Sequence, residues 1–128
     1  MTGHTKPLVY LAGPYSHDDP VANTHRTIQV ADELASGGHC IPYVPHLTLA
    51  WHLVSPKPYD FWIGYDLEVL RRCDAVLRLP GISAGADGEV AEAERLGMPV
   101  AYDIDDLYRL LWAAECRDFG CEEAHRGH

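Results

Sequence analysis

The stretch from Pro80 to Val100 begins as a glycine-rich loop and continues as a helix that carries Glu89. Gly81 and Gly85 would let a ligand approach the backbone closely. Ser83 could cap the helix, whose first N–H groups would then favour an anion. The same pattern is also typical of a plain strand-to-helix turn followed by a surface glutamate. The residues therefore fit both a ligand site and a plain turn at this place.

The spacing within this helix adds one observation about Glu89. Positions 86, 90, 93 and 97 are predicted to face the core, and Glu89 borders Ala86 and Ala93 on the small-residue side. A carboxylate at that place would be partly desolvated, which raises its pKa, while the helix terminus lowers it. Such a carboxylate is a candidate for chemistry at a bound ligand.

Two further side chains could join Glu89. Asp66 lies at the end of the aromatic segment YDFWIGY, which includes Trp62 and is of a kind that can stack a flat ring. Tyr10 lies on an expected strand, from which its hydroxyl could reach a carboxylate across the sheet. Each has a structural alternative, since Asp66 could be a solvated helix residue and Tyr10 a core tyrosine.

Alternating strands and helices are expected to position these residues. Short apolar runs predict strands at residues 8–13, 39–45, 74–80 and 98–103. Helical spacing and end signals predict helices at residues 19–38, 59–72, 86–96 and 105–115. The segment 46–61 reads as irregular with one short helix, and an additional ligand segment is expected near residues 46–62. Two prolines place 39–45 at a sheet edge.

This alternation predicts an α/β fold. We expect a doubly wound, Rossmann- or flavodoxin-like parallel sheet of four or five strands with helices on both faces. One domain is expected over residues 1–128, with a core at 8–115 and a polar tail at 116–128. The apolar positions expected on the first helix are Val21, Ile28, Ala31 and Ala35, and those on the last are Leu107, Leu110, Leu111 and Trp112.

In such sheets, ligands bind outside the carboxyl ends of the strands. That rule selects three loops, at residues 13–19, 45–57 and 80–87. The first loop contains Gly13 and Tyr15, and the second contains His46. We expect these residues to contact a ligand.

Composition and charge exclude several functions. The chain has 128 residues, a formal net charge of −9 and no basic stripe, so nucleic-acid polymers are not expected partners. It has no apolar run that could span a membrane and no export leader, so we expect a cytoplasmic protein. Zinc-ligand residue types gather only near the chain end, in Cys116, Cys121, His125 and His128. Their spacing fits no common zinc module, so no metal is expected.

Three segments together resemble the nucleoside 2-deoxyribosyltransferase superfamily: VYLAGPYS (9–16), GYDLEVLRRCDAVLRLPG (64–81) and SAGADGEVAEAERLGMPV (83–100). The likeness covers about residues 8–103. This superfamily includes transferases that exchange bases between deoxynucleosides, hydrolases that cut the N-glycosidic bond of nucleoside 5′-monophosphates, and uncharacterised relatives.

The resemblance implies a role for each matching residue. Glu89 matches the nucleophile, Tyr10 the tyrosine that holds it, and Asp66 the acid that contacts or protonates the base. Ser83 stands where monophosphate hydrolases have a serine that binds the 5′-phosphate and where transferases usually have an aspartate. The loop PYSHDDP lacks the arginines of some hydrolases.

The resemblance therefore implies cleavage of the N-glycosidic bond of a nucleoside 5′-monophosphate or nucleoside, by hydrolysis or base transfer. No metal or organic cofactor is implied, because two carboxylates and a tyrosine suffice for this chemistry. A homodimer or larger homo-oligomer is also implied. The alternative is a non-catalytic nucleotide-binding or sensing module of the same fold.

Overall fold

A parallel sheet forms the centre of the structure, a computed structural model that describes residues 5–119. Its four strands are β1 (Leu8–Ala12), β2 (Ile41–Tyr43), β3 (Ala75–Arg78) and β4 (Val100–Ala101). They stand in the order β2-β1-β3-β4, and all neighbours are parallel. The chain thus winds outward in two directions from the central pair β1 and β3. This confirms the predicted doubly wound sheet and places β2 at an edge.

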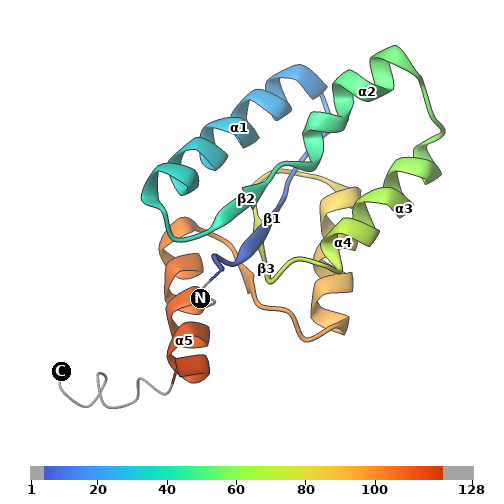
Figure 1. The fold of residues 1–128 in the computed structure, drawn as a ribbon. Coiled ribbons are helices and arrows are strands. Elements are labelled where there is room, and N and C mark those ends of the chain that lie inside the picture. The colour runs from blue at the N-terminus through green and yellow to red at the C-terminus, as the bar shows by residue number, and fades with distance from the viewer. Residues whose placement is uncertain (1–4, 120–128) are drawn as a thin grey trace.

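Helices cover both faces of the sheet (Figure 1). The helices are α1 (Pro20–Gly37), α2 (Thr48–Val54), α3 (Tyr59–Leu70), α4 (Ala84–Arg95) and α5 (Ile104–Phe119), with a short 3₁₀ helix η1 (Pro45–Leu47) before α2. Helices α1 and α5 pack on one face, whereas α3 and α4 pack on the other. Helix α2 leads away from β2 and returns to α3 through residues 55–58, so that the two helices form an arm beside the sheet (Figure 1).

The alternation of side chains along β1 and β3 builds two cores. Val9 and Leu77 face α1 and α5, and they are at most 1% exposed. Tyr10, Ala12 and Val76 face α3 and α4 and are fully buried. Tyr10 therefore points toward the helices that carry Asp66 and Glu89, because the side chains of a strand alternate between its faces.

The apolar face predicted for α1 is confirmed at Ala31, which packs against the core, and is wrong at Val21, Ile28 and Ala35, which are exposed. Val21 is 67% exposed and Ile28 is 37% exposed, whereas Asn23, Thr27 and Leu34 are buried. The reason is that the buried polar residues form specific hydrogen bonds near the ends of the strands, which the apolar periodicity could not reveal.

Several element ends also differ from the prediction. The one short helix expected in residues 46–61 is confirmed by α2, and the start of α3 agrees with the helix predicted from residue 59, whereas η1 was not predicted. Helix α4 ends at Arg95 and Gly97 adopts a φ of +74°, so position 97 does not belong to the inward face of that helix. Helix α5 continues past residue 115 to Phe119, and Trp112 on it is 45% exposed, which makes its predicted core position wrong.

The remainder of the predicted polar tail, including Cys121, His125 and His128, lies outside the described residues. Among the side chains that the structure describes, no cluster of three or more His, Cys, Asp or Glu residues could hold a metal ion. In the same part of the chain, none of the helices is long and apolar enough to cross a membrane.

Candidate active site

A cavity of about 380 Å³ opens at the carboxyl edge of the sheet. Its wall is made by the loop after β1, the segment after β2, the first two turns of α3 and the start of α4. All residues predicted to contact substrate line it: Gly13, Tyr15, His46, Trp62, Ser83 and Gly85. Asp66 and Glu89 line it as well, and Tyr10 lies beneath them on β1. The three predicted loops and the helix with Asp66 thus meet at one place.

Glu89 is held by a hydrogen bond from the sheet below it. The hydroxyl of Tyr10 donates to Glu89 Oε2 over 2.5 Å, a length typical of a charge-assisted O–H···O bond. Tyr10 itself is fully buried and lies beside Tyr43 of β2, with ring centroids 5.7 Å apart. Its pKa is raised by burial and by the charge of Glu89, so the phenol remains a proton donor. One carboxylate oxygen of Glu89 is therefore fixed.

Asp66 projects into the same cavity from the second turn of α3. Its Oδ1 atom is enclosed and has no hydrogen-bond partner within the described residues. Burial raises the pKa of this carboxyl to about 7. An enclosed carboxyl without a donor nearby favours its neutral form, because an isolated buried charge is costly. Asp66 is thus suited to carry a proton near neutral pH.

The two carboxyls affect one another. The pKa of Glu89 is raised to about 7, because burial and the charge of Asp66 raise it by more than the Tyr10 hydrogen bond and the charge of Arg78 lower it. Burial also raises the pKa of Asp66, and no hydrogen bond or positive charge from the described residues lowers it in return. The Tyr10 hydrogen bond favours the ionised form of Glu89, whereas the enclosed oxygen of Asp66 has no partner in the described chain that would favour its ionised form.

The loop between β3 and α4 lies very close to the loop after β1. Gly81 has a φ of +118°, and a Cβ atom added there would lie 2.6 Å from Pro14 Cγ in the loop after β1. Glycine is required at this position because other residues rarely adopt that backbone and no side chain would fit. Arg78 donates to the Leu79 and Gly81 carbonyls, and it pairs with Asp87 in the first turn of α4.

Helix α4 begins at the cavity with a side-chain cap. Ser83 Oγ accepts from the Ala86 N–H over 3.0 Å, as the sequence predicted. The cap leaves its own hydroxyl proton available to a ligand. The N–H groups of Ala84 and Gly85 precede the first intrahelical bonds, and such groups favour an anion. No lysine or arginine lines the cavity in the part of the chain that the structure describes.

His46 enters the cavity wall as a buried, neutral side chain. It is 3% exposed, and its Nε2 atom lies 2.8 Å from the Pro14 carbonyl oxygen and 3.4 Å from Thr27 Oγ1. A carbonyl only accepts, so Nε2 carries the proton and Nδ1 is left with a lone pair. Burial lowers the pKa of His46, which keeps the ring neutral.

Polar residues of α1 support the loop after β1. Asn23 Nδ2 donates to the Tyr15 and His17 carbonyls over 2.9 and 2.7 Å. Sequence reasoning missed Asn23 and Thr27 because both read as ordinary helix-surface residues. The signal that could have found them is their position, since they are polar residues on the face of α1 that turns inward, where apolar residues are usual. Asn23 and Thr27 support the site without lining it, and the lining residues that were not singled out from the sequence are Ser16, His17, Pro45, Thr48, Tyr59, Ile63, Ile82 and Ala84.

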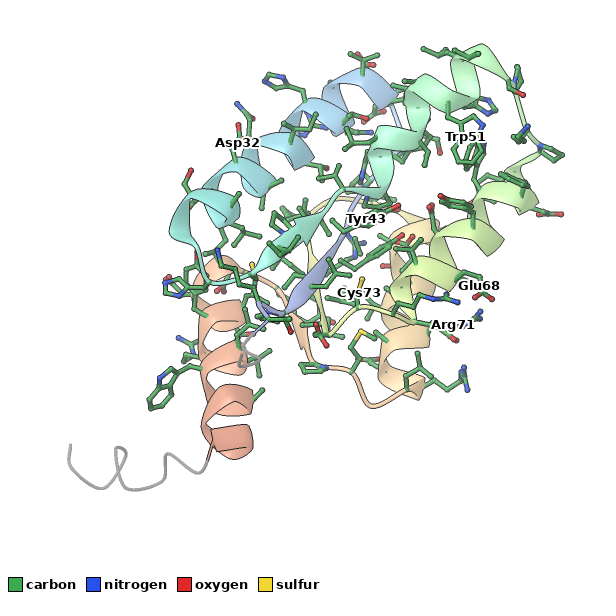
Figure 2. The ribbon with its side chains drawn as sticks, in the orientation of Figure 1. Asp32, Tyr43, Trp51, Glu68, Arg71 and Cys73 are labelled. Carbon is green, nitrogen blue, oxygen red and sulfur yellow. The ribbon has the colours of Figure 1, made fainter. Side chains whose placement is uncertain are left out.

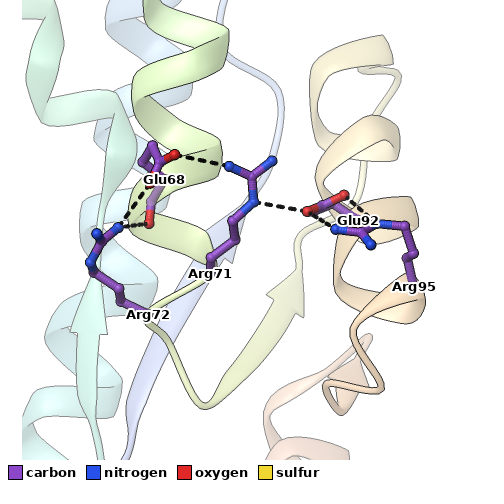
Figure 3. A network of polar contacts seen from close by, with 5 residues as sticks. All are labelled: Glu68, Arg71, Arg72, Glu92 and Arg95. Carbon is purple, nitrogen blue, oxygen red and sulfur yellow. Dashed lines mark hydrogen bonds and ion pairs between the residues drawn. The ribbon is translucent and has the colours of Figure 1, made fainter.

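An ion-pair network joins the two helices that carry the carboxyls (Figure 3). Arg71, just after α3, donates from Nε to Glu92 of α4 over 2.9 Å and from Nη1 to Glu68 over 3.1 Å. Arg95 donates two hydrogen bonds to Glu92, and the bonds from Arg95 and Arg71 together lower the pKa of Glu92 to about 2. The network links α3 to α4 beyond the cavity.

Comparison with known proteins gives a structural likeness and a family. A solved structure of a 2-deoxyribosyltransferase from the psychrotolerant bacterium Bacillus psychrosaccharolyticus is similar, with a TM-score of 0.52 and 20% sequence identity over 76% of this chain and 75% of that chain. At this identity the likeness shows a shared fold. No curated protein matches the chain by sequence. A family described as "Domain of unknown function (DUF7768)" matches residues 7–103, which is most of the chain, and the protein therefore belongs to that family.

Proposed function

We propose that the chain cleaves the N-glycosidic bond of a nucleoside or nucleoside 5′-monophosphate and releases the free base. Glu89 acts as the nucleophile at the anomeric carbon, and Asp66 acts as the acid that protonates the departing base. The observation that carries this proposal is the asymmetry of the carboxyl pair. Glu89 accepts from Tyr10, whereas the enclosed oxygen of Asp66 has no partner in the described chain.

Each of the two carboxyls meets one requirement of the reaction. Breaking an N-glycosidic bond develops positive charge on the sugar, and an adjacent carboxylate stabilises that charge and can bond to the anomeric carbon. The base leaves more readily when a nitrogen or oxygen atom of its ring system is protonated, which requires an acid with a pKa near the working pH. The raised pKa of Asp66, about 7, meets that requirement.

The second half of the reaction uses the same groups in reverse. After the base has left with the proton of Asp66, the sugar is bound to Glu89 through an ester. The Asp66 carboxylate then accepts a proton from the incoming nucleophile, which is water in hydrolysis or a second base in transfer. Attack at the anomeric carbon breaks the ester and restores both carboxyls.

The start of α4 is the part of the cavity suited to a 5′-phosphate. The Ser83 hydroxyl and the first N–H groups of α4 supply donors there, and the resemblance assigns a phosphate to a serine at this position. The absence of a lysine or arginine from the described cavity wall favours the plain nucleoside instead. We therefore keep both substrate classes in the test.

The test is a panel of nucleosides and nucleoside 5′-monophosphates, with free base measured by chromatography. The variants are Glu89→Gln and Asp66→Asn, and the matched control is Glu94→Gln on the exposed side of the same helix. We expect release by the wild type and the control, and a loss of at least about 100-fold in both cavity variants. Release only with an added second base would assign transfer. Binding of nucleotides without release by any form of the protein would overturn the proposal in favour of a sensing module.

A further inference from the structure

Trp62 lines the cavity with its only polar atom already in use. The indole Nε1–H donates to His52 Nδ1 over 2.8 Å, and the backbone N–H of Lys57 donates to the same nitrogen over 3.2 Å. Because both donors point at Nδ1, this nitrogen carries no proton, and the neutral His52 ring holds its proton on Nε2. The indole therefore has no donor left for a ligand.

Aromatic rings from α2 and α3 fix the same indole from other sides. Trp51 lies 5.0 Å from Trp62 by ring centroids at an interplanar angle of 81°, and its side chain lies between α2 and α3 (Figure 2). Phe61 and Tyr65 lie 4.9 and 5.9 Å from Trp62, also edge to face. Such arrangements are the favoured ones for aromatic pairs. Trp62 thus has a single, well-supported orientation.

Trp62 and Asp66 stand four residues apart on α3 and both line the cavity. Residues at this spacing share one helix face. A flat ring that lies against the carbon atoms of Trp62 would therefore present an edge toward the Asp66 carboxyl. This places the nucleobase of the proposed substrate on the α3 side of the cavity.

We infer that His52 is a positioning residue that fixes Trp62 as an aromatic wall for the base, so that the base is recognised on this side by ring contact and not by an indole hydrogen bond. The inference rests on the proposed function only in taking the flat ligand group to be a nucleobase. His52 acts through Trp62, because Trp62 lines the cavity and His52 does not.

The experiment compares His52→Leu, which removes the acceptor, with His52→Asn, whose Oδ1 atom can accept in place of Nδ1. Trp62→Phe and the double variant His52→Leu with Trp62→Phe complete a cycle, and His25→Leu on the exposed side of α1 is the control. For each, KM and kcat are measured with the cleaved nucleoside or nucleotide. Dissociation constants for purine and pyrimidine nucleosides are measured in the Glu89→Gln background, so that this measurement does not depend on turnover.

We expect His52→Leu to raise KM and the dissociation constant about three- to tenfold, the range of an aromatic contact, with kcat within about twofold. His52→Asn should restore both values, and His52→Leu should add nothing once Trp62 is Phe. In nitrogen–proton correlation spectra, the indole signal that is absent from Trp62→Phe should shift in His52→Leu and return in His52→Asn.

The inference is overturned if KM and the dissociation constant do not change in His52→Leu, or if they change equally in the Trp62→Phe background. It is also overturned if no nucleoside binds. Tight binding with this pattern but without base release would refute the proposed function and leave the inference intact. Base release that does not depend on His52 would support the proposed function and overturn the inference.

Discussion

Replacing Tyr10 by Phe tests the asymmetry of the carboxyl pair directly. Tyr10 is fully buried and donates a 2.5 Å hydrogen bond to Glu89, so the substitution removes one oxygen and leaves the packing ring in place. A hydrogen bond to a charged group contributes about 1.5–3 kcal/mol. At about 1.4 kcal/mol per pKa unit, its loss raises the pKa of Glu89 by about one to two units.

The consequence for the rate follows from the proton that the pair shares. Both carboxyls have a pKa of about 7 in the present structure. When the pKa of Glu89 rises, the proton moves from Asp66 to Glu89, which gives a protonated nucleophile and an ionised acid. Because the two pKa values are about equal, the productive form starts at about half of the singly protonated pair and then falls by about 5- to 50-fold. Alkaline pH cannot restore the maximum, because it removes the proton that Asp66 must donate.

The assay is kcat/KM for base release between pH 5 and pH 10. We expect a bell-shaped profile for the wild type, and for Tyr10→Phe a lower maximum whose alkaline limb lies about one to two pH units higher. Tyr43→Phe is the matched control, since it removes a hydroxyl from the adjacent ring without a bond to Glu89. A Tyr10→Phe rate within twofold of the wild type would refute the reasoning. So would a rate that recovers fully at high pH.

Three further predictions concern stability. Glu89→Gln should stabilise the protein at pH 8 by at most about 3 kcal/mol in urea unfolding. The reason is that the pKa of Glu89 in the folded protein, about 7, lies above the ordinary 4.5, so the wild type loses stability as the pH rises between these values. The gain should vanish at pH 4, where the carboxyl is largely protonated in both states. Gly81→Ala should cost about 1–3 kcal/mol by the same measurement, since φ is +118° and Pro14 Cγ lies 2.6 Å from the added carbon; an unchanged midpoint would contradict this. Asn23→Ala should cost about 2 kcal/mol and raise KM, because two carbonyls of the loop after β1 lose their donor; Asn23→Asp should not rescue it.

The sequence predicted the sheet and the place of the site because both follow from local signals. Buried parallel strands are short apolar runs, and a doubly wound sheet brings the loops after its strands to one edge. Gly13 and His46 were expected at the site by that rule, and Ser83 by its place as a helix cap and by the resemblance; all three line the cavity. The strand position made Tyr10 a candidate, and the resemblance paired it with Glu89, to which its bond spans 79 positions of the chain.

What the sequence did not predict depends on tertiary contacts. The inward face of α1 is polar because Asn23 serves carbonyls of a loop and Thr27 contacts His46, and neither partner is visible in the periodicity of the helix. The short helix expected in this segment, residues 46–61, is confirmed by α2, but its packing beside α3 was not predicted, because contacts such as Trp51 with Trp62 form only when α3 folds back beside it. The asymmetric surroundings of Asp66 and Glu89 likewise exist only in the folded chain.

The buried carboxyl pair has a consequence for any calorimetric study of this protein. Two groups with a pKa of about 7 hold close to one proton between them at neutral pH, and a ligand that displaces water from the cavity changes that number. The protons taken up or released are exchanged with the buffer. The heat of ligand binding will therefore differ between phosphate and Tris, in proportion to their ionisation enthalpies, and the slope will count the protons that accompany binding.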